Sequence, residues 1–219
     1  MDDADPYKSW RSAMARLVGS TDDLIRWQDR RYRFANEIGR LLTEPSGDRP
    51  VVDGAVLYGV YVSGVGLAYV GQTGDARRRL RDLPIGESHH LGMTVPPELW
   101  EKIIVVCWPL LADTLPQPAR RTVTGLDPEV VGLALEHLVQ VEYRPPLNAR
   151  SRGANGTWRE RRVIGSRSRG ALHAHMVQSL YELVRDAWQD LSAPSPSEPT
   201  PPVRTTSAGR VVYPSAMND

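Results

Sequence analysis

Eight arginines lie close together in the later part of the chain and are suited to binding a polyanion. They occur within residues 144–170 beside a single acid, Glu160, although the whole 219-residue chain carries 27 basic and 26 acidic residues. The eight are Arg144, Arg150, Arg152, Arg159, Arg161, Arg162, Arg167 and Arg169. Because a local positive surface on a nearly neutral protein attracts phosphates, this segment predicts a phosphate-facing surface.

Two tripeptides with a central valine carry the next candidates for chemistry. Gly59-Val60-Tyr61 lies in one apolar segment and Tyr69-Val70-Gly71 in the next, with the tyrosines eight positions apart. Arg79 follows Tyr69 by ten positions, and Glu136 precedes Asn148, the last residue of a Pro-Leu-Asn sequence, by twelve. Five points in this order resemble the GIY-YIG nuclease superfamily, which is named after the two tripeptides.

The resemblance implies a role for each of these residues. Glu136 would bind a catalytic metal ion, Mg²⁺ or Mn²⁺, and Arg79 would assist at the phosphate. One tyrosine hydroxyl would orient or deprotonate the attacking water while the other contacts the phosphate, and we favour Tyr61 over Tyr69 as the general base. The positions expected to have structural roles are Gly59, Gly71 and Asn148.

One position departs from the family pattern. Many members carry a histidine four residues after the arginine, where this chain has Leu83. His89 and His90 follow shortly afterwards, and one of them, with His90 as our candidate, would take over the proton-handling role. The alternative is that both are ordinary polar residues of a loop.

The residue types agree with phosphodiester hydrolysis. That reaction needs a positioned water, an acceptor for its proton, and positive charge near the phosphoryl oxygens. Arg79 lies beside the apolar stripe of its expected helix, so its side chain can run along the sheet, whereas Arg78 and Arg81 should face solvent. Glu136 should lean over Gly132, which would leave room for an ion and a phosphate.

Hydrophobic periodicity predicts the elements that position these side chains. Strands are expected at 56–62, 67–71 and 101–108, and helices at 75–83, 128–143 and 171–191. The β-β-α-β-α order predicts an α+β fold with a small three-stranded antiparallel sheet flanked by helices. Residues 1–50 should add two helices, the second capped by Thr21, as an N-terminal extension.

Four regions follow from these assignments. We expect a helical extension over 1–50 and a nuclease domain over 51–149. An Arg-rich loop and a C-terminal helix should then occupy 150–191, before a disordered, proline-rich tail over 192–219. The residues expected to bind nucleic acid are Arg150, Arg152, Arg159, Arg161 and Arg162.

The composition limits the class of protein. One cysteine, Cys107, excludes a disulfide framework, and no apolar run is long enough to cross a membrane, so we expect a cytoplasmic protein without membrane contact. The combined interpretation is a metal-dependent DNA endonuclease of restriction or defence type, which would form a homodimer if it cuts both strands. The alternative is a nucleic-acid-binding module that has the nuclease fold without catalytic turnover.

Overall fold

The central strands form where apolar residues run almost without interruption. β1 (Val56–Val62) pairs with β2 (Gly66–Thr73) as the predicted hairpin and with β3 (Trp100–Val106) on its other side. Both pairings are antiparallel, and the first five residues of β1 are buried because helices cover both faces of the sheet. This computed structural model describes residues 5–47, 50–86, 91–152, 155, 157–194 and 199–217.

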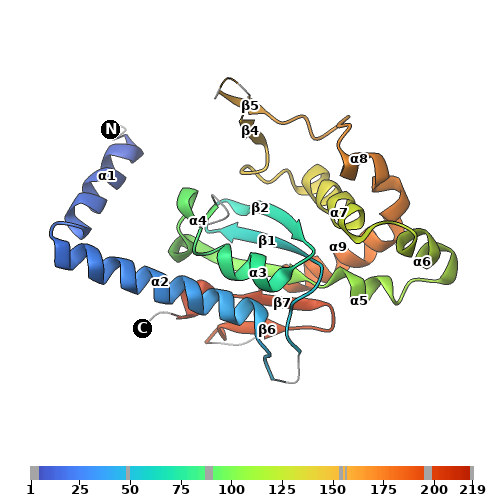
Figure 1. Cartoon of the computed structure of the whole chain (residues 1–219), viewed down its shortest axis with the longest axis horizontal. Coiled ribbons are helices and arrows are strands. Elements are labelled where there is room, and N and C mark those ends of the chain that lie inside the picture. Colours follow the sequence, from blue (N-terminus) through green and yellow to red (C-terminus); the bar gives the residue numbers. More distant parts are fainter. Residues whose placement is uncertain are drawn as a thin grey trace.

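Two further strands extend the sheet to five. β7 (Gly209–Val212) pairs antiparallel with β3, and β6 (Val203–Thr205) pairs with β7, which gives the order β2-β1-β3-β7-β6 (Figure 1). The expected three-stranded sheet is therefore wrong, although the α+β class is confirmed. The expected disordered tail is also wrong for residues 199–217. The proline-rich composition suggested disorder, but the segment also contains a short apolar run, Val211-Val212-Tyr213. This run is buried where β7 pairs with the edge of β3.

A buried arginine fixes this C-terminal hairpin to the N-terminal part of the chain. Arg210 on β7 is 2% exposed, and its guanidinium donates hydrogen bonds to the carbonyl oxygens of Leu41 (2.9 Å), Glu44 (2.6 Å) and Pro50 (3.1 Å). The first two carbonyls belong to the end of helix α2 (Thr21–Thr43), where backbone oxygens lack partners within the helix. Arg210 therefore acts as a C-terminal cap for α2 from a distant strand.

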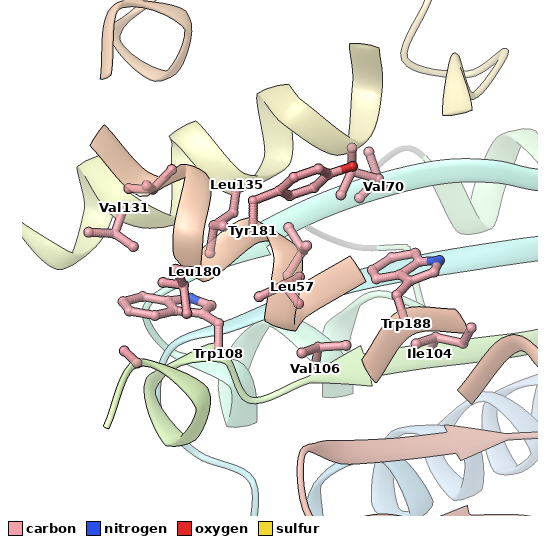
Figure 2. Packing of buried hydrophobic residues seen from close by; sticks show 14 of the residues in the cluster. Leu57, Val70, Ile104, Val106, Trp108, Val131, Leu135, Leu180, Tyr181 and Trp188 are labelled. Carbon is pink, nitrogen blue, oxygen red and sulfur yellow. The ribbon is translucent and has the colours of Figure 1, made fainter. Parts of the chain in front are cut away.

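Helices cover both faces of the sheet. On one face, α7 (Pro128–Tyr143) and α9 (Gln178–Ser192) pack Leu135 and Trp188 against Leu57 and Ile104 of the strands (Figure 2). On the other face lie α2 and α3 (Ala76–Asp82), whose apolar residues contact the alternate side chains of β1. Because successive strand residues point to opposite faces, each residue of β1 belongs to one of two separate cores.

The two predicted N-terminal helices are confirmed, with a different cap. α1 (Pro6–Leu17) precedes α2, and the side chain of Ser20, rather than Thr21, accepts the hydrogen bond from the backbone N–H of Asp23 at 3.1 Å. α1 stands away from the sheet (Figure 1) and exposes Tyr7 and Trp10.

The basic segment contains more regular structure than expected. A two-stranded sheet of β4 (Arg150–Arg152) and β5 (Trp158–Glu160) replaces the predicted loop. The predicted final helix is divided into α8 (Arg169–His173), the 3₁₀ helix η2 (Ala174–Val177) and α9. The remaining short helices are α4 (Leu91–Thr94), η1 (Pro97–Leu99), α5 (Trp108–Ala112), α6 (Gln117–Thr124) and η3 (Pro214–Met217). Within the described ranges, none of the helices has the length and apolar character needed to cross a membrane.

Candidate active site at the edge of strand β2

Two tyrosines lie together on the α3 side of the sheet. The rings of Tyr58 on β1 and Tyr69 on β2 have centroids 6.2 Å apart, and their hydroxyls are hydrogen-bonded to each other. Gly71 lies directly opposite Tyr58 in the strand register. A β-carbon at Gly71 would lie 2.6 Å from the Tyr58 hydroxyl oxygen, so the absence of a side chain there makes room for the pair.

Tyr61 does not belong to this pair. The partner of Tyr69 in the register is Val60, and after an irregularity between Val60 and Tyr61 the partner of Tyr61 is Leu67. Directly paired residues share a face, so Tyr61 points to the opposite side of the sheet. The expectation that Tyr61 and Tyr69 share one site is therefore wrong. Tyr58, which the sequence analysis overlooked, is the second tyrosine. It lies two residues before Val60 on β1 and therefore shares a face with Val60 and Tyr69.

On the opposite face, the Tyr61 hydroxyl already has partners. It accepts a hydrogen bond from the indole N–H of Trp188 at 2.9 Å and lies 3.0 Å from the Ser192 hydroxyl. The Lys102 ammonium lies 5.0 Å from the centre of its ring and donates to the Ser192 carbonyl oxygen. Burial is the main cause that raises the pKa of Tyr61, which disfavours its use as a general base. Gly59 lies on this face too, where its missing side chain admits the Trp188 ring.

Arg79 brings a positive charge to the tyrosine pair from α3. The helix begins at an Asp75 cap and buries Ala76 and Leu80, which leaves the Arg79 side chain half-buried beside the sheet, as predicted. Its Nε atom is buried and has no hydrogen-bond partner. A buried donor without a partner costs free energy, so this group is suited to an anionic ligand. Arg81 is only partly exposed, rather than fully solvent-facing as expected, because it pairs with Glu44 of the α2 end at 2.8 Å.

Glu136 reaches the same strand from α7. Its half-buried carboxylate accepts hydrogen bonds from the Gln140 side chain at 2.6 Å and from the backbone N–H of Gln72 on β2. Burial raises the pKa of Glu136 to about 7, and the Arg161 charge and these hydrogen bonds oppose the increase only in part. The expected open space over Gly132 is absent, since a β-carbon there would lie 2.6 Å from the Gln72 side-chain oxygen.

Electrostatic interactions connect these groups into one cluster. Burial is the main cause that raises the pKa of Tyr58 well above its usual value and that of Tyr69 to about 12. The negative charge of Glu136 raises both pKa values further, and the positive charge of Arg79 opposes the increase. Both hydroxyls therefore keep their protons at neutral pH and serve as hydrogen-bond donors.

Asn148 holds the outer edge of β2 next to this cluster. Its side-chain amide donates to the Val70 carbonyl oxygen at 2.8 Å, and its side-chain oxygen accepts from the Val70 N–H at 2.8 Å. The neighbouring Leu147 N–H donates to the Ala68 carbonyl oxygen. Asn148 thereby hydrogen-bonds to the edge of β2 that no other strand of the sheet occupies, as a neighbouring strand would. This agrees with the structural role expected for it.

The remaining predicted residues are only partly described. Arg159, Arg161 and Arg162 are exposed at the end of β5 and just after it. Arg150 and Arg152 lie in β4, but their side chains fall outside the described part, as do His89 and His90 altogether. The structure also brings Gln72, Gln140 and Arg161 to Glu136; Gln140, four residues after Glu136 on one helix, was detectable from its spacing.

The described side chains are compatible with one bound Mg²⁺ or Mn²⁺. No group of three His, Cys, Asp or Glu side chains gathers within the described ranges, and Glu136 is the carboxylate that this cluster would offer to a metal. Mg²⁺ is commonly held by one or two carboxylates together with waters and substrate phosphates. The raised pKa of Glu136 points the same way, because a nearby cation stabilises a carboxylate that the protein leaves under-neutralised.

Comparison with known proteins adds no identification. No protein-family model, curated protein or solved structure matches the chain.

Proposed function

We propose that this protein is a metal-dependent endonuclease that hydrolyses phosphodiester bonds in DNA. The observation that carries the proposal is the gathering of Tyr58, Tyr69, Arg79 and Glu136 from four separate elements at the edge of β2. It combines two protonated hydroxyls, an arginine with an unused buried donor and a carboxylate suited to a cation. These groups meet the needs of a charged phosphoryl centre.

Each residue has a definite task in this proposal. Arg79 binds a phosphoryl oxygen through its fork of donors, and the Tyr69 hydroxyl donates to the same phosphate. Tyr58 holds the Tyr69 hydroxyl in place through their hydrogen bond. Glu136 would hold a metal ion, and the ion would supply a water acidic enough to release its proton to solvent and a positive charge for the phosphoryl oxygens. Gln140 and the Gln72 N–H fix the orientation of the Glu136 carboxylate.

A second candidate is a nucleic-acid-binding module without turnover. The observation that favours it is the Gln72 side chain, which occupies the space over Gly132 beside Glu136. Phosphate contacts from Arg159, Arg161 and Arg162 would provide affinity in either case, since affinity for DNA needs no chemistry.

Removal of the metal distinguishes the two candidates. Incubation with supercoiled plasmid and Mg²⁺ or Mn²⁺ should give nicked or linear DNA, and EDTA should abolish cutting because it removes the ion that would activate the water and neutralise the phosphate. Gel electrophoresis of the plasmid measures both. Salt-sensitive binding with no cutting in either metal would contradict the nuclease and favour the binding module.

Paired tyrosine variants test the corrected assignment. Tyr69→Phe should reduce the rate of cutting by about 100-fold, because it removes a hydrogen bond to the charge that develops on the phosphate. Tyr61→Phe should keep the rate and lower the free energy of unfolding by about 1 kcal/mol, because it removes the acceptor for the Trp188 N–H. Single-turnover rates and urea denaturation measure these effects. A larger loss of rate for Tyr61→Phe than for Tyr69→Phe would restore Tyr61 to the site.

A further inference from the structure

The Arg-rich hairpin is joined directly to the strand that carries the site. We call β4 and β5, with Arg161 and Arg162 after them, the basic arm; in Figure 1 its strands project away from the five-stranded sheet. The backbone N–H of Arg161 donates to the carbonyl oxygen of Ala149 at 2.7 Å. The preceding residue, Asn148, is bound to Val70 of β2 through both ends of its amide. The base of the arm is therefore held in a fixed position relative to Tyr69.

Arg161 lies where two hollows meet. A small hollow of about 70 Å³ is lined by Glu136, His137 and Arg161 among others. A larger one of about 340 Å³ is lined by Arg161 together with Asn148 and Arg162. Arg161 thus borders both the carboxylate of the candidate site and the basic surface outside it, whereas Arg162 borders only the larger hollow.

The charge of Arg161 acts on the site itself. It acts on Tyr69 of β2, where it lowers the pKa against the larger effect of burial. Its side chain is exposed, and within the described part of the chain no carboxylate comes close enough to form an ion pair with it. Arg161 therefore offers a full set of donors next to the Glu136 carboxylate, free to bind an incoming anion.

We propose that Arg161 is an active-site residue that binds the phosphate group acted on by Arg79 and Tyr69, from the opposite side of β2. This proposal rests on the proposed function. Arg79 approaches from α3 on one face of the sheet, and Arg161 approaches from the arm beside α7, which covers the other face. Two arginines on either side of one phosphate neutralise its charge where that charge grows during hydrolysis. Arg159 and Arg162, which are exposed, would contact the DNA backbone farther away.

Comparison of Arg161→Ala with Arg162→Ala tests the assignment. With DNA at saturation and Mg²⁺ present, Arg161→Ala should slow single-turnover cutting by about 100-fold, and Arg161→Lys should restore part of the rate. Arg162→Ala should instead weaken DNA binding and reduce its salt dependence. Equal cutting rates for the two alanine variants at saturation would overturn the proposal.

A binding cycle decides the same question without relying on cutting. In EDTA, the dissociation constant of a short fluorescent duplex is measured for Arg161→Ala, Arg79→Ala and the double variant. If one phosphate contacts both arginines, their effects should depart from additivity by about threefold or more, whereas Arg162→Ala and Arg79→Ala should be additive. Additive effects for Arg161 and Arg79 would overturn the proposal even in a protein that cuts. The expected coupling in a protein that cuts no DNA would refute the nuclease and keep Arg161 as a phosphate ligand of the site.

Discussion

Glu136→Gln should abolish metal-dependent cutting and at the same time make the folded protein more stable above pH 7. The amide cannot act as an anionic metal ligand, so cutting should fall below detection while binding to DNA persists. The gain in stability has a separate cause. The folded protein buries the carboxylate and raises its pKa from 4.5 to about 7, so folding favours the protonated form.

The sign of the effect follows from that shift. Well below pH 4.5 the carboxyl group is protonated in both the folded and the unfolded chain, and Glu136 does not lower the free energy of unfolding. As the pH rises to about 7, the unfolded chain loses the proton first, and the free energy of unfolding decreases. Glutamine resembles the protonated form at every pH. We therefore expect the free energy of unfolding of the Glu136→Gln protein to exceed that of the wild type by on the order of 2 kcal/mol at pH 8. At pH 4 the two proteins should be equally stable.

Thermal unfolding at several pH values, with the plasmid assay on the same samples, measures both effects. The matched control is Glu182→Gln, which changes an exposed glutamate of helix α9 and should alter neither cutting nor the pH dependence of stability. A Glu136→Gln protein that cuts at the wild-type rate would contradict the assignment of Glu136 as the metal ligand. A melting temperature that moves in parallel with the wild type across this pH range would contradict the raised pKa.

Gly209→Ala should cause the largest loss of stability among the substitutions considered. A β-carbon at this position would lie 1.9 Å from the Val105 carbonyl oxygen, which belongs to the backbone of the neighbouring strand and cannot turn aside. The pairing of β7 with β3 must therefore shift or separate, which would expose Val211 and Val212 and withdraw Arg210 from the end of α2. We expect a loss of about 3 kcal/mol, measurable by urea denaturation.

Gly54→Ala is the matched control, because nothing lies within 4 Å of the β-carbon that it would introduce. It should leave the urea midpoint unchanged within error. Limited proteolysis adds a local readout, since separation of β7 should make residues 199–217 cleavable before the rest of the sheet. A Gly209→Ala protein as stable as Gly54→Ala would show that the C-terminal hairpin is not part of the sheet.

Much of the fold was predictable from local patterns. The hairpin of β1 and β2, the helix that begins after Asp127 and the long α2 helix follow from periodicity and caps, which act within a few residues. β6 and β7 were not predicted because they form by pairing with the edge of β3, which lies more than ninety positions away in the chain. The composition of the proline-rich segment did not indicate that it pairs with β3.

The candidate site was predicted in its residue types but not in its geometry. Arg79 and Glu136 lie near Tyr69 of β2, as the expected shared site requires, and Asn148 binds the same strand. Tyr61 does not, because the register at the turn end of the hairpin sends it to the opposite face, and such irregularities cannot be read from alternation alone. Likewise, the small size of Gly132 suggested space for a ligand, but the structure fills that space with Gln72.

The cap that Arg210 places on α2 has a consequence for how the chain folds during synthesis. The capped carbonyl oxygens belong to residues 41 and 44, so this contact forms only after some 170 further residues have left the ribosome. Until then, β3 has an unpaired edge and the end of α2 lacks its buried partner. Contacts of such long range slow folding, and an open strand edge favours aggregation. Docking of β6 and β7 is therefore a late step of folding, and a nascent chain that stalls before it would leave the edge of β3 open to pairing with other chains.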